Sequence, residues 1–521
     1  MLKNRTIIIL SLIFLLAFTL RVAYVTQVKA HPLSEDVFES DAFDQYRFDT
    51  LAKEISSGAW GGTDRPFQYE PLYSYFLAIS YKLFGYNHFT PRIIQAFIGS
   101  ILIFLMYLLT KEIFGRGAGF VAAFITAFYG IFVFYNGVLL RASLLVFLNV
   151  LVVFLLLLAR RKRKPFLWFL AGSVLGLSIL TRTNMLLPFV LFWILFAIKE
   201  VSFKKRVTFV LFFLLGSFIV ILPASYHNYK TSGKFMPVST DYTAFWVGNV
   251  HDGIGVDLIY TDIYHKMVEA SGNNTARMVK LFIEEIKEYP AEMQQLYLRK
   301  LRMFFNGYEV PANLNYYLFK EWPSILQRPF FNFTFISPLA ILGIFLSLKT
   351  KRETLLYIFF FVLSGSVILF HIQARYRLPV VPFFIIFASY AVVWLIRQLR
   401  CRKWGYIFMS TVVLVSLYSF VKPDPTYGLS YKANDLIRDT DYSMAAHSYF
   451  NKEDYDMAIY YFERGLRIKP NWVVGHSNLG IAYGKLGYYN QARREWEAAL
   501  HIDPNCESAQ NNLDALDAAG I

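Results

Sequence analysis

The chain has 521 residues, of which 56% are hydrophobic and 18% aromatic, and its mean hydropathy is +0.39. This composition excludes an ordinary soluble protein and predicts a polytopic membrane protein. The net charge of +15 does not indicate nucleic-acid binding, because the Lys and Arg residues cluster in short runs between apolar segments.

Eleven apolar segments predict membrane helices. The first, residues 6–28, follows Lys3 and Arg5 and lacks a clear small-residue cleavage site, so we expect it to be retained with its N-terminus in the cytoplasm. The others are residues 93–107, 120–134, 139–158, 166–180, 186–198, 207–222, 335–348, 355–370, 378–395 and 406–420.

Alternating these helices across the membrane places the basic runs 160–164, 199–206, 349–352 and 397–403 on the cytoplasmic side, as the positive-inside rule requires. Residues 38–92, 226–332, 371–377 and everything after 422 then lie outside. The two cysteines, Cys401 and Cys506, fall on opposite sides, so no disulfide framework is expected. The predicted domains are a membrane domain (1–421, with external loops at about 29–92 and 226–332), a linker (422–441) and a C-terminal domain (442–521).

The first external loop, residues 39–73, is polar and acidic. Apolar residues at helical spacing predict an amphipathic helix that begins with Ser40 as N-cap: Phe48, Leu51, Ala52 and Ile55. Asp44 lies in line with this buried stripe, with Arg47 beside it. Two interpretations are open: Asp41 and Asp44 stabilise the helix N-terminus, or one of them is a general base.

The C-terminal domain has an internal period of 34 residues. Equivalent pairs include Ala458 with Ala492, Phe462 with Trp496, and Pro470 with Pro504. This spacing is typical of tetratricopeptide repeats (TPRs), in which small residues let paired helices approach closely. Because about two and a half repeats are fewer than the roughly three that an independent solenoid needs, we expect the tail to rest on the membrane domain or on a partner. The alternative is a solubilising cap without a ligand.

Four motifs carry a family resemblance. They are DQYRFDTLAKEISSGAW at 44–60 with FQYEPLYSYFLAISYKLFG at 67–85, LTRTNMLLP at 180–188, GYEVPANLNY at 307–316, and ARYRLPVVPF at 374–383. In this order they resemble the membrane glycosyltransferases of GT-C type, in particular glycosyltransferase family 39, which includes protein O-mannosyltransferases and lipid A aminoarabinose and galacturonic acid transferases. The resemblance covers roughly residues 7–399. It implies an all-α bundle of about eleven membrane helices, here followed by an α-helical TPR solenoid.

The resemblance also implies a reaction: an inverting glycosyltransferase (EC 2.4 class) moves a sugar from a polyprenyl-phosphate donor to an extracytoplasmic acceptor, which is a protein, lipid A or another glycan. Such a step needs a base near the acceptor and positive charge near the phosphate. The match of DQYRF to the family's helix start implies that Asp44 is the base, with Asp41 as runner-up.

Arginine suits the carrier phosphate because its planar fork binds two oxygens at once. The candidates are Arg47 by motif, Arg375 and Arg377 where a membrane helix re-enters from outside, and, with weaker support, Arg141, Arg182 and Arg65. Snorkelling to lipid headgroups is the alternative role for Arg375 and Arg377. Candidate substrate-loop residues are Tyr69, Glu70, Glu309, Asn313 and Asn249.

No His or Cys spacing typical of a metal site occurs, and we expect no cofactor besides the lipid-linked sugar, although Asp41 or Asp44 could hold a divalent ion. The expected partners are the donor, the acceptor, membrane lipid and a protein bound through the TPRs, but no nucleic acid. The expected location is a bacterial inner membrane, with the TPR domain extracytoplasmic. Two rival functions are a transporter or flippase of lipid-linked sugars, and a non-catalytic assembly factor that acts through its TPRs.

Overall fold

A computed structural model describes residues 2–39, 41, 43–183, 186–198, 200–233, 243–256, 260–272, 274–322, 325–348, 354–423 and 437–520. Within these ranges the regular secondary structure is helical, apart from one isolated bridge between Tyr129 and Phe331. The all-α prediction is therefore confirmed for the described residues. The predicted N-cap Ser40, Asn184 of the LTRTN turn, and most of the predicted linker lie outside them.

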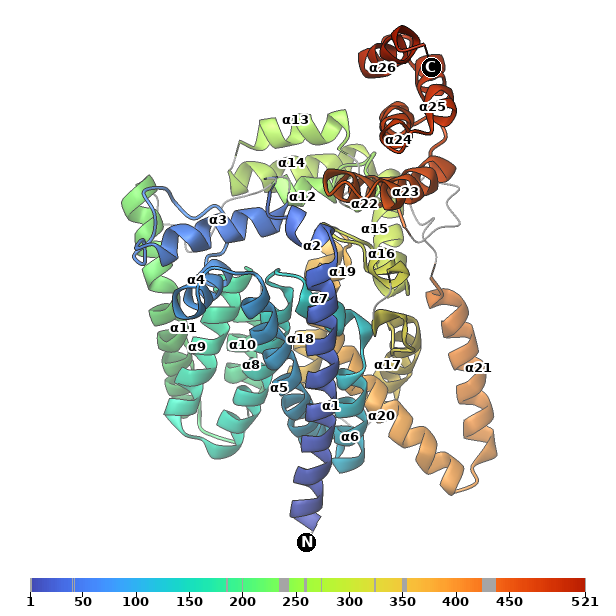
Figure 1. Cartoon of the computed structure of the whole chain (residues 1–521). Coiled ribbons are helices and arrows are strands. Elements are labelled where there is room, and N and C mark those ends of the chain that lie inside the picture. Colours follow the sequence, from blue (N-terminus) through green and yellow to red (C-terminus); the bar gives the residue numbers. More distant parts are fainter. Residues whose placement is uncertain are drawn as a thin grey trace. The chain divides into compact units, whose positions relative to one another are not determined.

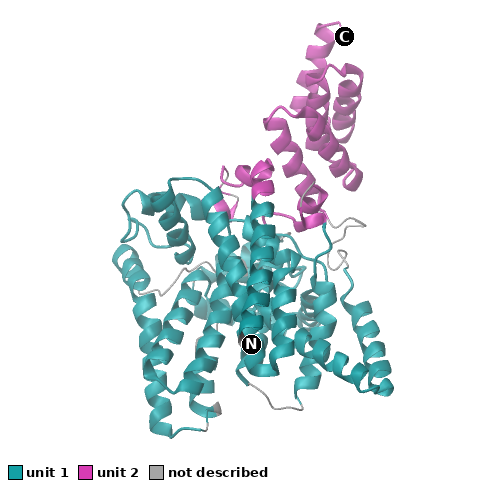
Figure 2. Cartoon of the chain, turned by 60° about the horizontal axis from the view of Figure 1, so that its bottom comes forward, with its two compact units in different colours: residues 1–25, 47–312, 328–430 teal, residues 26–46, 313–327, 431–521 magenta. Residues whose placement is uncertain are grey.

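The chain divides into two compact units that interleave along the sequence (Figure 2). Unit 1 comprises Met1–Val25, Arg47–Ala312 and Arg328–Ser430, and unit 2 comprises Thr26–Tyr46, Asn313–Gln327 and Tyr431–Ile521. Two helices, α1 (Leu2–Ala30) and α3 (Asp44–Ser56), contribute residues to both units.

The remaining helices of unit 1 include both long apolar helices and shorter polar ones. They are α4 (Leu72–Phe84), α5 (Phe89–Phe114), α6 (Arg116–Ala127), α7 (Gly130–Gly137), α8 (Ala142–Lys162), α9 (Pro165–Thr181), α10 (Leu186–Phe192), a π-helix (Trp193–Ala197), α11 (Phe203–Ser232), α12 (Thr243–Val247), α13 (Asp262–Ser271), α14 (Thr275–Glu288), α15 (Pro290–Phe305), α17 (Phe333–Leu348), α18 (Thr354–Leu369), α19 (Ala374–Arg377), a 3-10 helix (Leu378–Val380), α20 (Val381–Arg400) and α21 (Trp404–Val421).

Six helices among the described residues are long and apolar enough to cross a membrane: Asn4–Ala30, Phe89–Phe114, Ala142–Lys162, Phe203–Ser232, Ala374–Arg400 and Trp404–Val421. Four shorter apolar helices, α6, α9, α17 and α18, coincide with further predicted spans. Figure 1 shows these helices running in roughly the same direction. The chain is thus a multi-pass membrane protein, whereas the count of eleven spans stays a prediction.

The predicted span 120–134 is wrong as a single helix, because α6 ends at Ala127 and α7 starts at Gly130. The Phe331 N–H donates to the Phe128 carbonyl at 2.9 Å, and the Gly130 N–H donates to the Phe331 carbonyl at 3.0 Å. These bonds engage backbone groups at the point where the helix is interrupted, so the pairing with a distant segment replaces helical continuation.

Helices α9 and α11 approach closely because glycines line their contact. A Cβ atom on Gly172 would lie 1.9 Å from the Phe213 carbonyl oxygen, and one on Gly216 would lie 2.1 Å from the Phe169 carbonyl oxygen. The Ser217 hydroxyl donates to the Gly172 carbonyl at 2.9 Å across the same contact. Small residues that bring backbones together in this way are a common means of packing membrane helices.

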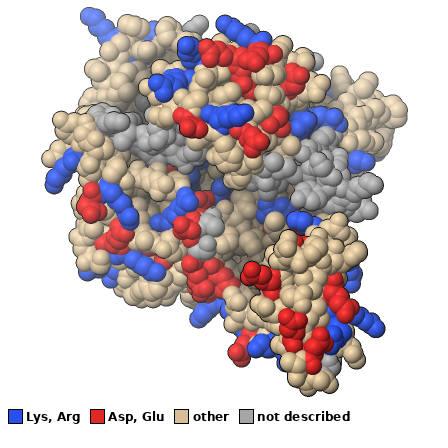
Figure 3. Space-filling view, turned by 90° about the horizontal axis from the view of Figure 1, so that it is seen from above, with Lys and Arg blue, Asp and Glu red and all other residues tan. Residues whose placement is uncertain are grey.

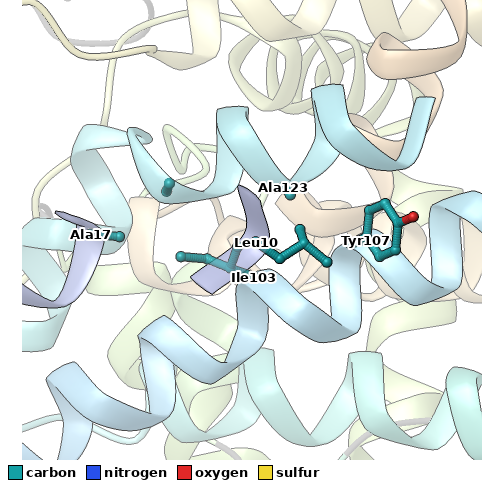
Figure 4. Packing of buried hydrophobic residues seen from close by; sticks show 6 residues of the cluster. Leu10, Ala17, Ile103, Tyr107 and Ala123 are labelled. Atoms are coloured by element: carbon teal, nitrogen blue, oxygen red, sulfur yellow. The ribbon is translucent and has the colours of Figure 1, made fainter. Parts of the chain in front are cut away.

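Helix α1 packs on α5 and α6 through a buried apolar cluster (Figure 4). Its members are Leu10, Ala17, Ile103, Tyr107, Ala123 and Ala127. One helical turn beyond Ala17, the buried Arg21 donates to Asn136 Oδ1 at 3.0 Å and to the Ala127 carbonyl at 3.0 Å. A buried guanidinium needs such acceptors, so these bonds fix α1 to α7 and to the end of α6.

The segments predicted to be extracytoplasmic meet one another in unit 1. The Phe67 N–H donates to Asn228 Oδ1 at 2.9 Å, the Ile372 N–H to the Gly255 carbonyl at 2.9 Å, and the Ala374 N–H to the Val310 carbonyl at 2.9 Å. At the predicted cytoplasmic side, Arg160 pairs with Glu200, and Arg161 with Glu112 at 3.3 Å. Both sets of contacts agree with the predicted alternation of loops.

Unit 2 is built from the C-terminal repeats and two short segments of the external loops. Its helices are α2 (Leu33–Asp36), α16 (Tyr316–Glu321), a 3-10 helix (Ile325–Gln327), α22 (Asp439–Asn451), α23 (Tyr455–Ile468), α24 (Val473–Lys485), α25 (Tyr489–Ile502) and α26 (Glu507–Ala518). The equivalent residues of the 34-residue period are buried: Ala458 and Ala492, Phe462 and Trp496. The predicted repeat pattern is therefore confirmed.

His31 lies at the centre of a set of rings in unit 2. It is 1% exposed, and its ring centroid lies 4.6 Å from that of Phe319 and 5.2 Å from that of Trp322. Neither ring nitrogen has a hydrogen-bond partner among the described residues. Burial, helped by the charge of Lys452, lowers the pKa of His31 to about 3, so the native protein holds this imidazole neutral.

This burial makes the stability of unit 2 sensitive to acid. Below the unfolded-state pKa of about 6.5, His31 binds a proton in the unfolded chain but not in the native protein. The free energy of unfolding therefore falls as the pH drops from about 6.5 towards 3, and at pH 5 this loss is about 2 kcal/mol. His31→Phe removes this proton uptake. Between pH 7.5 and pH 5 the free energy of unfolding of the variant should therefore fall by about 2 kcal/mol less than that of wild type. Pulse proteolysis of the repeats in urea measures the difference. His501→Phe, at an exposed position of α25, is the control, and equal losses in His31→Phe and wild type would contradict the assignment.

Candidate functional site

Three arginines from three separate segments gather around one carboxylate and one tyrosine in unit 1. Glu70, just before α4, accepts hydrogen bonds from the Arg141 guanidinium and from the Thr183 N–H at 2.8 Å. Arg182, at the end of α9, interacts electrostatically with Glu70, Arg141 and Arg375. We call Glu70, Arg141, Arg182, Arg375 and Tyr376 the arginine cluster.

Tyr376 joins two of these arginines. The guanidinium carbon of Arg182 lies 3.5 Å from the centroid of the Tyr376 ring, and that of Arg375 lies 4.9 Å from it. Arg375 also donates to Gln373 Oε1 at 2.8 Å and to the Tyr376 hydroxyl at 3.2 Å. Tyr376 thus holds the guanidinium groups of Arg182 and Arg375 on one ring, and guanidinium groups are well suited to bind oxyanions.

The electrostatics of the cluster favour an anion. Burial raises the pKa of the Glu70 carboxyl, but the charge of Arg141 and the hydrogen bond from Thr183 outweigh burial and leave this pKa below its usual value. Glu70 is therefore ionised at neutral pH, and the cluster as defined carries three positive charges against one negative charge. A site of this kind, where external segments meet apolar helices, attracts phosphate groups.

Arg377 and Glu309, predicted separately to contact phosphate and substrate, pair with each other. Arg377 Nη2 lies 2.8 Å from Glu309 Oε2, and both side chains are buried. Arg377 also donates to the carbonyls of Phe304, Asn306 and Tyr308 at 3.0, 2.5 and 3.1 Å. These bonds fasten the end of α15 to α19, so we infer that the Arg377–Glu309 pair supports the backbone that carries Arg375.

The amphipathic helix predicted in the first loop is present as α3, with Phe48, Ala52 and Ile55 buried. The helix begins at Asp44, so the predicted start directly after Ser40 is wrong. At its start Arg47 donates to the Tyr69 hydroxyl, with its guanidinium carbon 5.5 Å from the Tyr69 ring centroid. The guanidinium of Arg141 lies 5.6 Å from the ring of Phe48. This end of α3 therefore borders the arginine cluster.

The two candidate bases lie in unit 2. Asp44 is the first residue of α3 and is partly exposed, and Asp41 precedes the helix and is exposed. Asp44 is thus four residues before Phe48 on a continuous helix, as the pattern predicted. The roles of Asp44 and Asp41 stay predictions.

Another carboxylate on α3, Asp49, was not among the predicted site residues. It is buried and accepts hydrogen bonds from Tyr81 at 2.6 Å and Lys53 at 2.8 Å, with His88 Nε2 at 3.2 Å. Burial raises the pKa of Asp49, but the hydrogen bonds from His88, Lys53 and Tyr81 outweigh it and lower the pKa below its usual value. Asp49 therefore fastens α3 to α4 as an ionised carboxylate.

Three further predicted site residues have their described contacts with residues outside the arginine cluster. Arg65 is exposed and forms a surface pair with Glu54 at 2.6 Å. Asn313 belongs to unit 2, where it donates to Gln45 Oε1 at 2.7 Å. Asn249 is buried and donates to the carbonyls of Phe245 at 2.7 Å and Leu369 at 2.8 Å.

Lys300, which the sequence pattern did not single out, completes the Asn249 site. Its fully buried ammonium group donates to Asn249 Oδ1 at 3.1 Å and to the carbonyls of Gly248 and Phe370 at 2.9 and 2.8 Å. A Cβ on Gly248 would lie 1.8 Å from the Phe370 oxygen, so only glycine fits there. Burial lowers the pKa of Lys300 to about 7. This contact ties α15 to the end of α18, which lies four residues before Gln373 and six before Arg375.

In the described part of the chain, no group of three or more His, Cys, Asp or Glu residues has the arrangement of a metal site. Figure 3 shows acidic and basic side chains mixed over the face seen from above, rather than a surface of one sign. The arginine cluster is thus the arrangement best suited to an anionic ligand among the sites described above.

Residues 64–227 match the family described as dolichyl-phosphate-mannose-protein mannosyltransferase. The matched segment contains Glu70, Arg141 and Arg182, whereas Arg375 lies beyond it. Residues 442–471 and 473–506 each match the tetratricopeptide repeat, which agrees with the period read from the sequence.

The chain is also similar to solved membrane enzymes. The oligosaccharyltransferase from Archaeoglobus fulgidus in the apo form has 15% identity and a TM-score of 0.46, over 88% of this chain and 57% of that chain. ArnT from Cupriavidus metallidurans bound to undecaprenyl phosphate has 13% identity and a TM-score of 0.44, over 96% of this chain and 77% of that chain. This chain spans 50% to 57% of the archaeal oligosaccharyltransferase chains. No curated protein sequence matches it.

Proposed function

We propose that this protein is an inverting membrane glycosyltransferase of GT-C type, which moves a sugar from a polyprenyl-phosphate donor to an extracytoplasmic acceptor. The observation that carries the proposal is the arginine cluster: Arg141, Arg182 and Arg375 surround Glu70 and Tyr376 within and next to the segment that matches the mannosyltransferase family. The family description names a polyprenyl-phosphate sugar, and a phosphate is the ligand that such a cluster suits.

In the proposed reaction the acceptor oxygen or nitrogen attacks the anomeric carbon of the sugar. The bond from that carbon to the phosphate oxygen breaks, and its electron pair leaves with the polyprenyl phosphate. Asp44 takes the proton of the acceptor, with Asp41 as the alternative base. Arg182 and Arg375 stabilise the charge that grows on the leaving phosphate, while Arg141 is held by Glu70.

The proposal includes the predicted topology of about eleven spans, with the N-terminus in the cytoplasm and the TPR domain outside a bacterial inner membrane. The TPR domain would recruit the acceptor or a protein partner, because tetratricopeptide repeats present extended surfaces to other proteins. The acceptor class, whether protein, lipid A or another glycan, stays open.

Transfer by the purified full-length chain tests the proposal. The protein is incubated with radiolabelled polyprenyl-phosphate mannose and a membrane extract of the source cell, and covalent label in the acceptor fraction is counted. Transfer that requires the lipid-linked sugar and is absent with the corresponding nucleotide sugar supports the proposal. Passage of intact donor across a vesicle membrane without covalent transfer would favour the flippase, and neither activity would favour an assembly factor.

A further inference from the structure

The repeats of unit 2 are completed by segments from the first and second large external loops. Lys452, just after α22, donates to the Pro32 carbonyl at 3.2 Å, and its ammonium lies 3.8 Å from Asp36. The ring centroid of Tyr449 lies 6.3 Å from that of His31. The first repeat therefore packs against the residues that immediately follow α1, where a longer solenoid would continue with a preceding repeat.

The second external loop covers the same end of the repeats. Glu321, at the end of α16, accepts two hydrogen bonds from Arg464 at 2.8 and 2.9 Å. Asn315 donates to Asp441 Oδ2 at 2.6 Å, and both side chains are buried. Asp441 also accepts from the Arg438 N–H at 2.9 Å, so this carboxylate holds the beginning of α22 and the beginning of α16 together.

A second hydrogen bond continues from this contact to the start of α3. Two residues before Asn315, Asn313 donates to Gln45 Oε1 at 2.7 Å. Gln45 is 1% exposed and follows Asp44 directly in α3. Two side-chain hydrogen bonds and three residues of backbone thus connect the first repeat helix to the residue beside the proposed base.

We propose that the TPR domain positions the start of α3, and with it Asp44, for sugar transfer. Asn313 and Asn315 are the positioning residues, because each ties one end of the short connection between α22 and Gln45. The inference rests on the proposed function, in which Asp44 is the base, and it gives the repeats a role in the transfer step that recruitment of an acceptor does not require.

Recruitment and positioning predict different kinetics. A repeat domain that only captures the acceptor affects the amount of acceptor needed for half-maximal transfer. A repeat domain that positions Asp44 affects the maximal rate at saturating acceptor, since a misplaced base slows the reaction of every bound acceptor. Binding of the donor by unit 1 should be unaffected, because the arginine cluster lies wholly in that unit.

The experiment compares Asn313→Ala and Asn315→Ala with wild type in the full chain, with transfer measured over a dilution series of membrane extract. We expect the maximal rate to fall by about 10- to 100-fold, with the half-saturating amount of extract and the binding of undecaprenyl phosphate unchanged. Asn512→Ala is the matched control, because Asn512 is partly exposed on α26 and its described hydrogen bond is local, to the Ser508 carbonyl at 2.6 Å.

Two rescues separate positioning from loss of folding. Asn313→Asp should retain most of the rate, because Gln45 Nε2 has no hydrogen-bond partner among the described residues and the amide can turn to donate to the new carboxylate. Glu321→Arg should lower the maximal rate, and combining it with Arg464→Glu should restore the rate by re-forming the pair.

Wild-type maximal rates in both alanine variants would overturn the inference alone, as would a change confined to the half-saturating amount of extract. A wild-type chain that transfers no sugar would overturn the proposed function and this inference together. Loss of rate in Asn313→Ala with recovery in Asn313→Asp supports the inference even if Asn315→Ala fails to fold.

Discussion

Asp44→Asn should lower the maximal rate of sugar transfer by about 10²- to 10⁴-fold, which is the usual contribution of a general base. The amide keeps the size of the side chain and its place at the start of α3, but it cannot take the proton of the acceptor. Transfer from radiolabelled polyprenyl-phosphate mannose at saturating extract measures the effect, and binding of undecaprenyl phosphate should stay at the wild-type level.

Asp41→Asn is the matched control, because Asp41 lies three residues earlier, outside the helix and exposed. It should keep most of the wild-type rate. If Asp41→Asn alone were inactive, Asp41 would be the base and the proposed reaction would stand with that change. Normal transfer by both variants would leave these acids the structural role of stabilising the start of α3, and the proposed mechanism would lose its base.

Arg182→Met should lower the ratio of maximal rate to donor KM by about 10²- to 10³-fold, the size expected when one donor to a developing negative charge is removed. Because the phosphate is charged before and after the reaction, part of this loss should appear as weaker binding of undecaprenyl phosphate. Arg182→Lys should recover little, since an ammonium cannot reproduce the flat stacking at 3.5 Å on the Tyr376 ring.

Arg65→Met controls for the loss of a positive charge from an external loop. Arg65 is 64% exposed and pairs with Glu54 at the surface, and such pairs contribute about 1 kcal/mol or less to stability. Its transfer and donor binding should match wild type. Equal, small effects of Arg65→Met and Arg182→Met would mean that the arginine cluster does not bind the donor phosphate.

Periodic features of this chain could be predicted from its sequence because they depend on near neighbours. The buried stripe of α3 follows from helical spacing of Phe48, Ala52 and Ile55, and the repeats follow from small and aromatic residues 34 positions apart. The interruption between α6 and α7 could not be predicted in this way, since it depends on hydrogen bonds to Phe331, about 200 residues further along.

The candidate site shows the same limit. Arginine and acid candidates could be named one by one, but their partners lie far away in sequence: Arg377 pairs with Glu309, and Arg141 pairs with Glu70. Lys300 gave no signal, because it lies in the sequence RKLR, where a buried lysine looks like its exposed neighbours. Only tertiary contacts distinguish a charge that holds the backbone from one that can meet a substrate.

The interleaving of unit 2 also bears on how the protein is made. Residues 26–46 leave the ribosome first, whereas the helices that complete their unit, α22 to α26, are synthesised last. Each nascent chain must therefore be synthesised beyond α21 before unit 2 can close. A chain whose synthesis stops before α22 contains the residues of the arginine cluster but an unfinished unit 2, so under the proposals above it should transfer sugar more slowly than the full chain.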